Sequence, residues 1–224
     1  MSVLMRKLAA AKGILFDLDN TLYPQEKGVF TRINERINEY VRLKTGREDQ
    51  EVDLLRQEYQ ERYGTTLGGL MRHKAVNTEE YLDFVHDIPV EDLLEPDPAL
   101  TNFLSSIKLP MVVFTNGTCR HAGRVLDAMG ISFLFDGICD LEATAYIGKP
   151  HKDAFEAAVG FLDCSLAETI FIDDLPVNVE AGGAIGTLSI HVNGHGDGVG
   201  DIQVKSVMDL ESIFFPMPWY REEC

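Results

Sequence analysis

The segment ILFDLDNTLYP, Ile14 to Pro24, decides how this chain folds. Its first three residues are apolar and favour a buried β-strand. They run directly into two aspartates spaced one residue apart, Asp17 and Asp19, which Thr21 follows. Such an ending fits either turn chemistry or a strand that delivers carboxylates to a functional site. The remainder of the chain has to distinguish the two.

Short apolar runs alternate with amphipathic helical patterns, which is typical of a parallel sheet covered by helices. Each run is nearly continuous in Val, Ile, Leu, Phe or Met, as expected for strands buried on both faces. The expected strands are Gly13–Phe16, Met111–Phe114, Thr169–Ile172 and Thr187–Val192. The expected helices among them are Ala99–Leu109, Arg120–Met129 and Lys152–Leu162.

About ninety residues separate the first two expected strands, far too many for one crossover. Their patterns predict helices over Val29–Lys44, Glu48–Tyr63 and Thr78–Val85, the last with Asn77 and Glu80 as a capping box. The sequence therefore predicts a helical module inserted into an α/β domain.

The net charge of the chain is strongly negative, since 20 Lys and Arg against 36 Asp and Glu give −16. This field repels nucleic acid and anionic lipid, so we expect neither a polynucleotide nor a membrane as partner. No apolar run approaches the roughly 18–20 residues that span a bilayer, and we expect no signal peptide. The four cysteines lack CxxC spacing, which favours reduced thiols and a cytoplasmic location.

Polar side chains follow the expected strands where each strand ends. They are Asp17, Asp19, Thr115, Asn116, Asp173, Asp174 and, just before the helix that begins at Lys152, Lys149. The carboxyl ends of parallel strands open on one edge of a sheet, where ligands bind. So many like charges at one edge would repel one another unless a cation lay among them. A hard divalent ion with oxygen ligands, Mg²⁺, is the cofactor that this pattern predicts.

Each motif has a simpler explanation when it is taken alone. Asp-x-Asp after a strand is common turn chemistry, and Asp173-Asp174 before Pro176 can begin a helix. Thr115-Asn116-Gly117 can be an ordinary turn, and Lys149 can be a solvated lysine. Four separate loops that each carry a suitable group at a strand end fit chance poorly, so together they predict a functional site.

Four stretches of the chain, FDLDNTLY, FTNGT, GKP and FIDDLPVNV, resemble in order the four signature motifs of the haloacid dehalogenase-like hydrolase superfamily. This resemblance extends over nearly the whole chain. It implies a Rossmann-like, doubly wound parallel sheet core formed by residues 1–23 and 95–224, with a helical cap formed by residues 24–94. It also implies a Mg²⁺-dependent phosphatase, because most members have that activity.

The resemblance implies a role for each catalytic residue. Asp17 would be the nucleophile that forms an aspartyl-phosphate. Asp19 would protonate the departing alkoxide and then deprotonate the attacking water. Thr115 and the Asn116 N–H would hold the phosphoryl oxygens, and Lys149 would offset the negative charge.

The metal ligands implied by the resemblance are Asp17, Asp19 through its backbone carbonyl, and Asp174. Asp173 would be a second carboxylate ligand or an acid that orients its neighbours. Asn178 stands where many relatives carry another acid, and we expect it to contact the site by a hydrogen bond.

Asp19 argues against dehalogenation, which has no alkoxide to protonate and needs no metal. A phosphomutase stays open, since it would use the same core with an acid/base group from the cap, such as His73 or Lys74. A catalytically silent protein is expected to have lost one of the acids, and none is missing.

The cap stretches YGTTLGGL, HKAVNTEEY and PVEDLLEPDPAL resemble the pyrimidine 5′-nucleotidase branch of this superfamily. That resemblance implies a nucleoside monophosphate such as UMP or CMP as substrate. Another small phosphomonoester, such as a sugar phosphate, is the alternative. The RHK cluster, Arg72–Lys74, is either a solvated helix face or a cationic patch in which Arg72 and His73 bind substrate.

Overall fold

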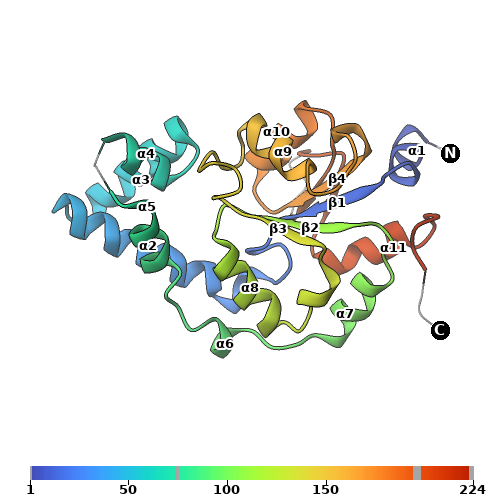
Figure 1. The fold of residues 1–224 in the computed structure, drawn as a ribbon, viewed down its shortest axis with the longest axis horizontal. Coiled ribbons are helices and arrows are strands. Elements are labelled where there is room, and N and C mark those ends of the chain that lie inside the picture. The colour runs from blue at the N-terminus through green and yellow to red at the C-terminus, as the bar shows by residue number, and fades with distance from the viewer. Residues whose placement is uncertain (1, 74–75, 194–197, 222–224) are drawn as a thin grey trace.

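The structure is a computed structural model that describes residues 2–73, 76–193 and 198–221. Within these residues the chain forms a parallel six-stranded sheet in the order β3-β2-β1-β4-β5-β6 (Figure 1). The strands are β1 (Gly13–Phe16), β2 (Met111–Phe114), β3 (Gly137–Cys139), β4 (Thr169–Asp173), β5 (Leu188–Val192) and β6 (Ile202–Val204). The helices are α1 (Val3–Ala9), α2 (Val29–Thr45), α3 (Asp49–Tyr63), α4 (Thr66–His73), α5 (Thr78–Val85), α6 (Val90–Leu93), α7 (Pro98–Ser105), α8 (Cys119–Ala128), α9 (Lys152–Val159), α10 (Pro176–Ala184) and α11 (Leu210–Phe214).

Each central strand is buried on both faces, because its side chains alternate between two helical layers. Ile14 and Phe16 of β1 pack in one core with residues of α7, α8 and α11. Leu15, between them, packs in a second core with residues of α9. The two helical layers lie on opposite sides of the sheet (Figure 1). The near-continuous apolar runs of the sequence follow from this double burial.

The order of the strands reverses between β1 and β4, because the chain adds β2 and β3 on one side of β1 and β4 to β6 on the other. In open α/β sheets such a reversal opens a crevice at the carboxyl ends of the strands, and ligands bind there. The predicted α/β fold, a doubly wound parallel sheet with inserted helices, is confirmed.

The inserted helices α2 to α5 lie together beyond the carboxyl edge of the sheet (Figure 1). They bury a separate core, in which Tyr40, Leu55, Tyr59 and Tyr81 take part and which Leu141, from the loop after β3, joins. Asn77 caps α5 by accepting the backbone N–H of Glu80 at 3.0 Å, which is one half of the predicted capping box. The Glu80 carboxylate pairs instead with Lys44 at 2.8 Å. The limits of the insertion, residues 24 and 94, stay a prediction.

Two further features bear on the sequence expectations. No helix within the described residues is long and apolar enough to cross a bilayer. Cys119, Cys139 and Cys164 are free thiols, while Cys224 lies outside the described residues.

Candidate active site

The backbone pairing of the sheet fixes the acids at the strand reversal. Asp17 directly follows β1, and its N–H donates to the carbonyl of Ile172 in β4 at 2.8 Å. Asp173 is the last residue of β4, and Asp174 follows it. Three carboxylates, those of Asp17, Asp173 and Asp174, therefore place oxygens within 4.8 Å of one another.

Lys149 is the buried cation of this site, with 1% of its surface exposed. Its Nζ donates to Asp17 Oδ1 at 2.6 Å, to Asp173 Oδ2 at 2.7 Å and to the carbonyl oxygen of Phe114 at 2.8 Å. Burial disfavours the ammonium form, but the two carboxylates outweigh burial and raise the pKa of Lys149. The lysine is therefore charged and fixed in place.

Gly148 allows the loop that carries Lys149 to approach the second strand. The amide of Asn116 accepts the N–H of Lys149 at 2.7 Å and donates to the Lys149 carbonyl at 3.0 Å. A Cβ at Gly148 would lie 2.4 Å from Asn116 Oδ1, so a larger residue would break this pair of hydrogen bonds. Thr115 lies beside it, and its hydroxyl accepts the Gly117 N–H at 2.9 Å.

The negative charge of the site exceeds what one lysine offsets. Burial and the neighbouring acids Asp173 and Asp174 raise the pKa of Asp17 well above its usual range, although Lys149 opposes that shift. Burial and Asp173 together raise the pKa of Asp174 to about 7. A further cation among these oxygens would relieve both shifts.

The donor set fits a hard divalent ion, because all its ligand atoms are oxygens. Asp17 and Asp174 are the carboxylates best suited to bind it directly. Asp173 is fully buried, and its Oδ1 accepts the N–H of Leu175 at 2.8 Å while its Oδ2 accepts Lys149. The amide of Asn178 donates to both Asp173 oxygens, at 3.1 and 3.2 Å, which agrees with the contact expected for that residue. Asp173 therefore fits the role of an orienting acid.

Asp19 faces a different set of partners. Its Oδ1 accepts the hydroxyl of Tyr23 and, at 3.0 Å, Nε2 of His121. Burial would raise the pKa of Asp19, but His121 and Tyr23 outweigh it and hold that pKa below its usual value. The sequence analysis missed His121; its place in the first turn of the helix that follows FTNGT was the available signal.

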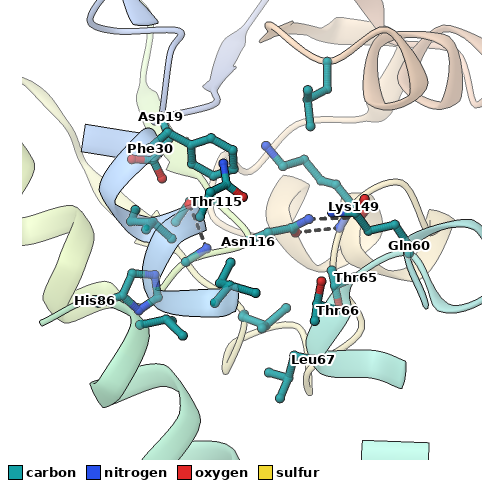
Figure 2. Close-up of a pocket in the computed structure, with 18 of the residues that line it drawn as sticks. Asp19, Phe30, Gln60, Thr65, Thr66, Leu67, His86, Thr115, Asn116 and Lys149 are labelled. Atoms are coloured by element: carbon teal, nitrogen blue, oxygen red, sulfur yellow. Dashed lines mark hydrogen bonds between the residues drawn. The ribbon is translucent and has the colours of Figure 1, made fainter. Parts of the chain in front are cut away.

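A cavity of about 190 Å³ joins these groups to the insertion. Its lining, shown in Figure 2, includes Asp19, Thr115, Asn116 and Lys149 of the core and Gln60, Thr65, Thr66 and Leu67 of the insertion. Phe30 and His86 complete two further sides. Both parts of the chain therefore form one pocket.

The pocket does not include Arg72 or His73, the cationic residues predicted to bind substrate. Both are exposed at the C-terminal end of α4. His73 hydrogen-bonds the hydroxyl of Tyr63 at 2.7 Å and stacks on Tyr59, and Lys74 lies outside the described residues. Instead, α3 supplies a cation that the sequence analysis missed, Arg56, which does line the pocket.

Comparison with known proteins finds relatives by sequence and by structure. Phosphate metabolism protein 8 of Saccharomyces cerevisiae is 31% identical over 194 residues, which cover 79% of this chain and 60% of that protein. The chain thus spans less than two thirds of that relative's length. Glyceraldehyde 3-phosphate phosphatase of Methanocaldococcus jannaschii is 23% identical over 222 residues, 90% of this chain and 96% of that protein.

Among solved structures, β-phosphoglucomutase from Clostridium difficile superposes with a TM-score of 0.63. It has 18% sequence identity, and the match covers 92% of this chain and 95% of that one, so this likeness concerns the fold. The sequence profile of the haloacid dehalogenase-like hydrolases matches residues 11–186, which include every acid of the site. The chain belongs to the haloacid dehalogenase-like hydrolase family.

Proposed function

We propose that this protein is a phosphatase that hydrolyses a small phosphomonoester through an aspartyl-phosphate on Asp17. The observation that carries the proposal is the meeting of Asp17, Lys149, Asp173 and Asp174 at the strand reversal. The relatives also support it, since the one from M. jannaschii is named a phosphatase and the one from yeast a phosphate metabolism protein.

In the first step, the carboxylate of Asp17 attacks phosphorus, and the bond from phosphorus to the ester oxygen breaks. Asp19, which lines the pocket, donates a proton to the departing oxygen. Lys149, bonded to Asp17 Oδ1 at 2.6 Å, offsets the charge of nucleophile and phosphoryl group. Thr115 and the Asn116 N–H line the pocket beside it and would hold the phosphoryl oxygens.

In the second step, water attacks the phosphorus of the aspartyl-phosphate. Asp19 accepts the proton of that water, inorganic phosphate leaves, and the carboxylate of Asp17 is regenerated. One residue thereby serves as acid and then as base.

Asp17, Asp174 and the backbone carbonyl of Asp19 would hold Mg²⁺, while Asp173 orients Lys149. When bound, the ion would neutralise phosphoryl charge and help to orient the substrate.

For the leaving group we propose a pyrimidine nucleoside, as in UMP or CMP. The support is a pocket wall on the insertion that combines apolar residues, among them Phe30, Ile33 and Leu67, with polar groups such as Arg56 and Gln60. Such a wall suits a flat, partly polar ring. The substrate would be met in the cytoplasm, where free thiols stay reduced.

A sugar or triose phosphate is the second candidate, because the M. jannaschii relative is named for glyceraldehyde 3-phosphate. A phosphomutase is less well supported. A mutase needs an acid/base group for the second phosphoryl transfer. His73, the residue expected to supply it, does not line the pocket.

A panel of phosphomonoesters tests the proposal. With Mg²⁺ present, UMP and CMP are expected to release inorganic phosphate with higher kcat/KM than AMP, GMP, glyceraldehyde 3-phosphate or a hexose phosphate. A lead of about tenfold for a sugar phosphate, or about 1.4 kcal/mol of transition-state preference, would overturn the nucleotidase assignment and leave the phosphatase standing. Formation of an isomeric phosphate without release of phosphate would indicate a mutase.

Arg56 is expected to contribute to the choice of leaving group. Its guanidinium donates to Asn34 Oδ1 at 2.8 Å and, on its other side, to Asn38 Oδ1 at 2.5 Å, so it is held by uncharged oxygens. In Arg56→Ala, kcat/KM for the preferred substrate should fall about 10- to 100-fold, the loss of one charged hydrogen bond, mainly through KM. Hydrolysis of p-nitrophenyl phosphate should change far less.

Arg62→Ala is the matched control for Arg56, since Arg62 lies on the same helix, is exposed and pairs with Glu58. It should leave kcat/KM unchanged for both substrates. Equal losses for the two substrates in Arg56→Ala, or none, would contradict the assignment. Arg56→Lys, which keeps the charge, separates binding from any loosening of the insertion.

A further inference from the structure

We infer that His121 and Tyr23 are positioning residues that decide which oxygen of Asp19 faces the substrate. The inference rests on the proposed function, in which Asp19 exchanges a proton with the leaving group. It assigns to two residues, one of them outside the four motifs, a part in the reaction.

The hydrogen bonds of Asp19 are one-sided. Oδ1 accepts both the Tyr23 hydroxyl and His121 Nε2, the latter at 3.0 Å. Within the described part of the chain, Oδ2 accepts no hydrogen bond, and the Asp19 side chain lines the pocket (Figure 2). Tyr23 follows β1 and His121 lies in α8, so two separate segments donate hydrogen bonds to the same oxygen. These two bonds fix the rotation of the carboxyl group.

His121 is built to donate from Nε2. Its side chain is completely buried, and its Nδ1 has no hydrogen-bond partner among the described residues. A proton on Nδ1 would be a buried donor without an acceptor, which is costly, whereas a proton on Nε2 is donated to Asp19. A hydrogen on Nε2, donated to Asp19, therefore satisfies the ring best.

The ring of His121 is also prevented from turning. The side chain of Thr118 caps α8 by accepting the backbone N–H of His121 at 3.1 Å, which fixes the backbone that carries the ring. His86 of the insertion stacks on the imidazole, with 4.6 Å between ring centroids and 22° between planes. His86 is itself bonded through Nδ1 to the Leu82 carbonyl. The insertion therefore braces the residue that orients Asp19.

Two donors on Oδ1 leave Oδ2 as the oxygen that can carry the exchanged proton. A carboxyl group free to rotate would present that oxygen only part of the time, and correct orientation is a large component of general-acid catalysis. The two hydrogen bonds to Oδ1 should therefore raise the rate most for leaving groups that depart only when protonated.

The test compares an alkyl phosphomonoester with p-nitrophenyl phosphate, whose phenolate departs without a proton. We compare kcat/KM, which reports the steps up to departure of the leaving group. In His121→Leu, kcat/KM for the alkyl ester should fall about 100-fold, the lower end of a general-acid contribution, and that for the aryl ester by less than about threefold. His121→Gln keeps an N–H donor and should recover most of the loss, and Tyr23→Phe should show the same selectivity at smaller size.

Asp127→Asn, an exposed change on the same helix, is the control and should alter neither substrate. Equal losses for both esters in His121→Leu, or no rescue by His121→Gln, would show a merely structural histidine and overturn the inference. Asp19→Asn is measured in parallel. If Asp19→Asn shows the leaving-group selectivity and His121→Leu does not, the positioning role of His121 is refuted and the proposed function stands. If neither variant shows it, the role of Asp19 in the proposed function is refuted.

Discussion

Asp17→Asn is expected to lower kcat by at least about 1,000-fold, because the substitution removes the atom that forms the covalent bond. The amide has nearly the same shape as the carboxylate, but its oxygen carries no charge and does not displace an alkoxide from phosphorus. An acid quench during turnover should find phosphate on the peptide that contains Asp17 in the wild type and none in the variant. This is the largest effect expected of a single substitution in the chain.

The fold of Asp17→Asn should survive. Burial raises the pKa of Asp17, so the ionised form is disfavoured by the folded state and its removal relieves that cost. Lys149 keeps its bond to Asp173 at 2.7 Å. We therefore expect a Tm no lower than a few degrees below wild type, and Asp127→Asn gives the baseline for an exposed Asp-to-Asn change. A correctly folded Asp17→Asn that retains more than a few per cent of wild-type turnover would contradict the nucleophile assignment.

The core of the fold could be predicted from sequence because parallel strands buried on both faces leave a strong apolar signal. All four expected strands lie within a residue of the observed ones. β3 and β6 were missed because each has only three residues and is partly exposed at an edge of the sheet. The helix expected at Ala99–Leu109 ends at Ser105, since the chain leaves it to pair Ile107 with Tyr220.

The acids of the site could be predicted for a topological reason. Once a sheet is parallel, residues that end different strands must share an edge, whatever their separation in sequence. Asp17 and Lys149 are 132 positions apart and bond at 2.6 Å. The roles of these residues in catalysis are a separate matter that the variants above address.

The residues of the insertion could not be located in the same way. Arg56 lies in a helix rich in Glu, Gln and Arg, a composition that reads as a solvated face. It meets Asn34 and Asn38 of α2 only through the packing of two helices. Arg72 and His73 were predicted to bind substrate because they lie beside a stretch that resembles a known cap. The eight-residue α4 buries Leu67 and Leu70, however, and leaves Arg72 and His73 exposed. The packing of the helices decides which of these residues line the pocket, and the spacing of residues in the sequence does not specify that packing.

Removal of divalent cations is expected to abolish turnover as completely as the loss of Asp17. Three carboxylates share an edge with one lysine, and a dianionic substrate adds to the same charge. EDTA should abolish turnover, and added Mg²⁺ should restore it. Ca²⁺ should restore little, because its longer bonds and looser coordination disturb the in-line geometry. Asp174→Asn should raise the Mg²⁺ concentration for half-maximal activity by at least about tenfold. Full activity in metal-free buffer would refute the magnesium assignment.

Thermal stability gives a reading of the same site that does not depend on turnover. In the metal-free protein, burial and Asp173 raise the pKa of Asp174 to about 7, whereas an unfolded Asp titrates near 3.9. Between those values the folded chain binds the extra proton, so this group makes the metal-free protein less stable as pH rises from about 4 to about 7.

Mg²⁺ needs the ionised carboxylate, so its effect on stability should run in the opposite direction. The rise in Tm on adding Mg²⁺ should be small near about pH 5 and grow until about pH 8. At about 100 times its Kd the ion would contribute about 2.7 kcal/mol. Asp174→Asn should remove most of this pH dependence, while Asp127→Asn should retain it. A Tm that rises equally with Mg²⁺ at both pH values, or in Asp174→Asn as in the wild type, would mean that the ion binds elsewhere, because the ionisation of Asp174 couples binding to protons in that window.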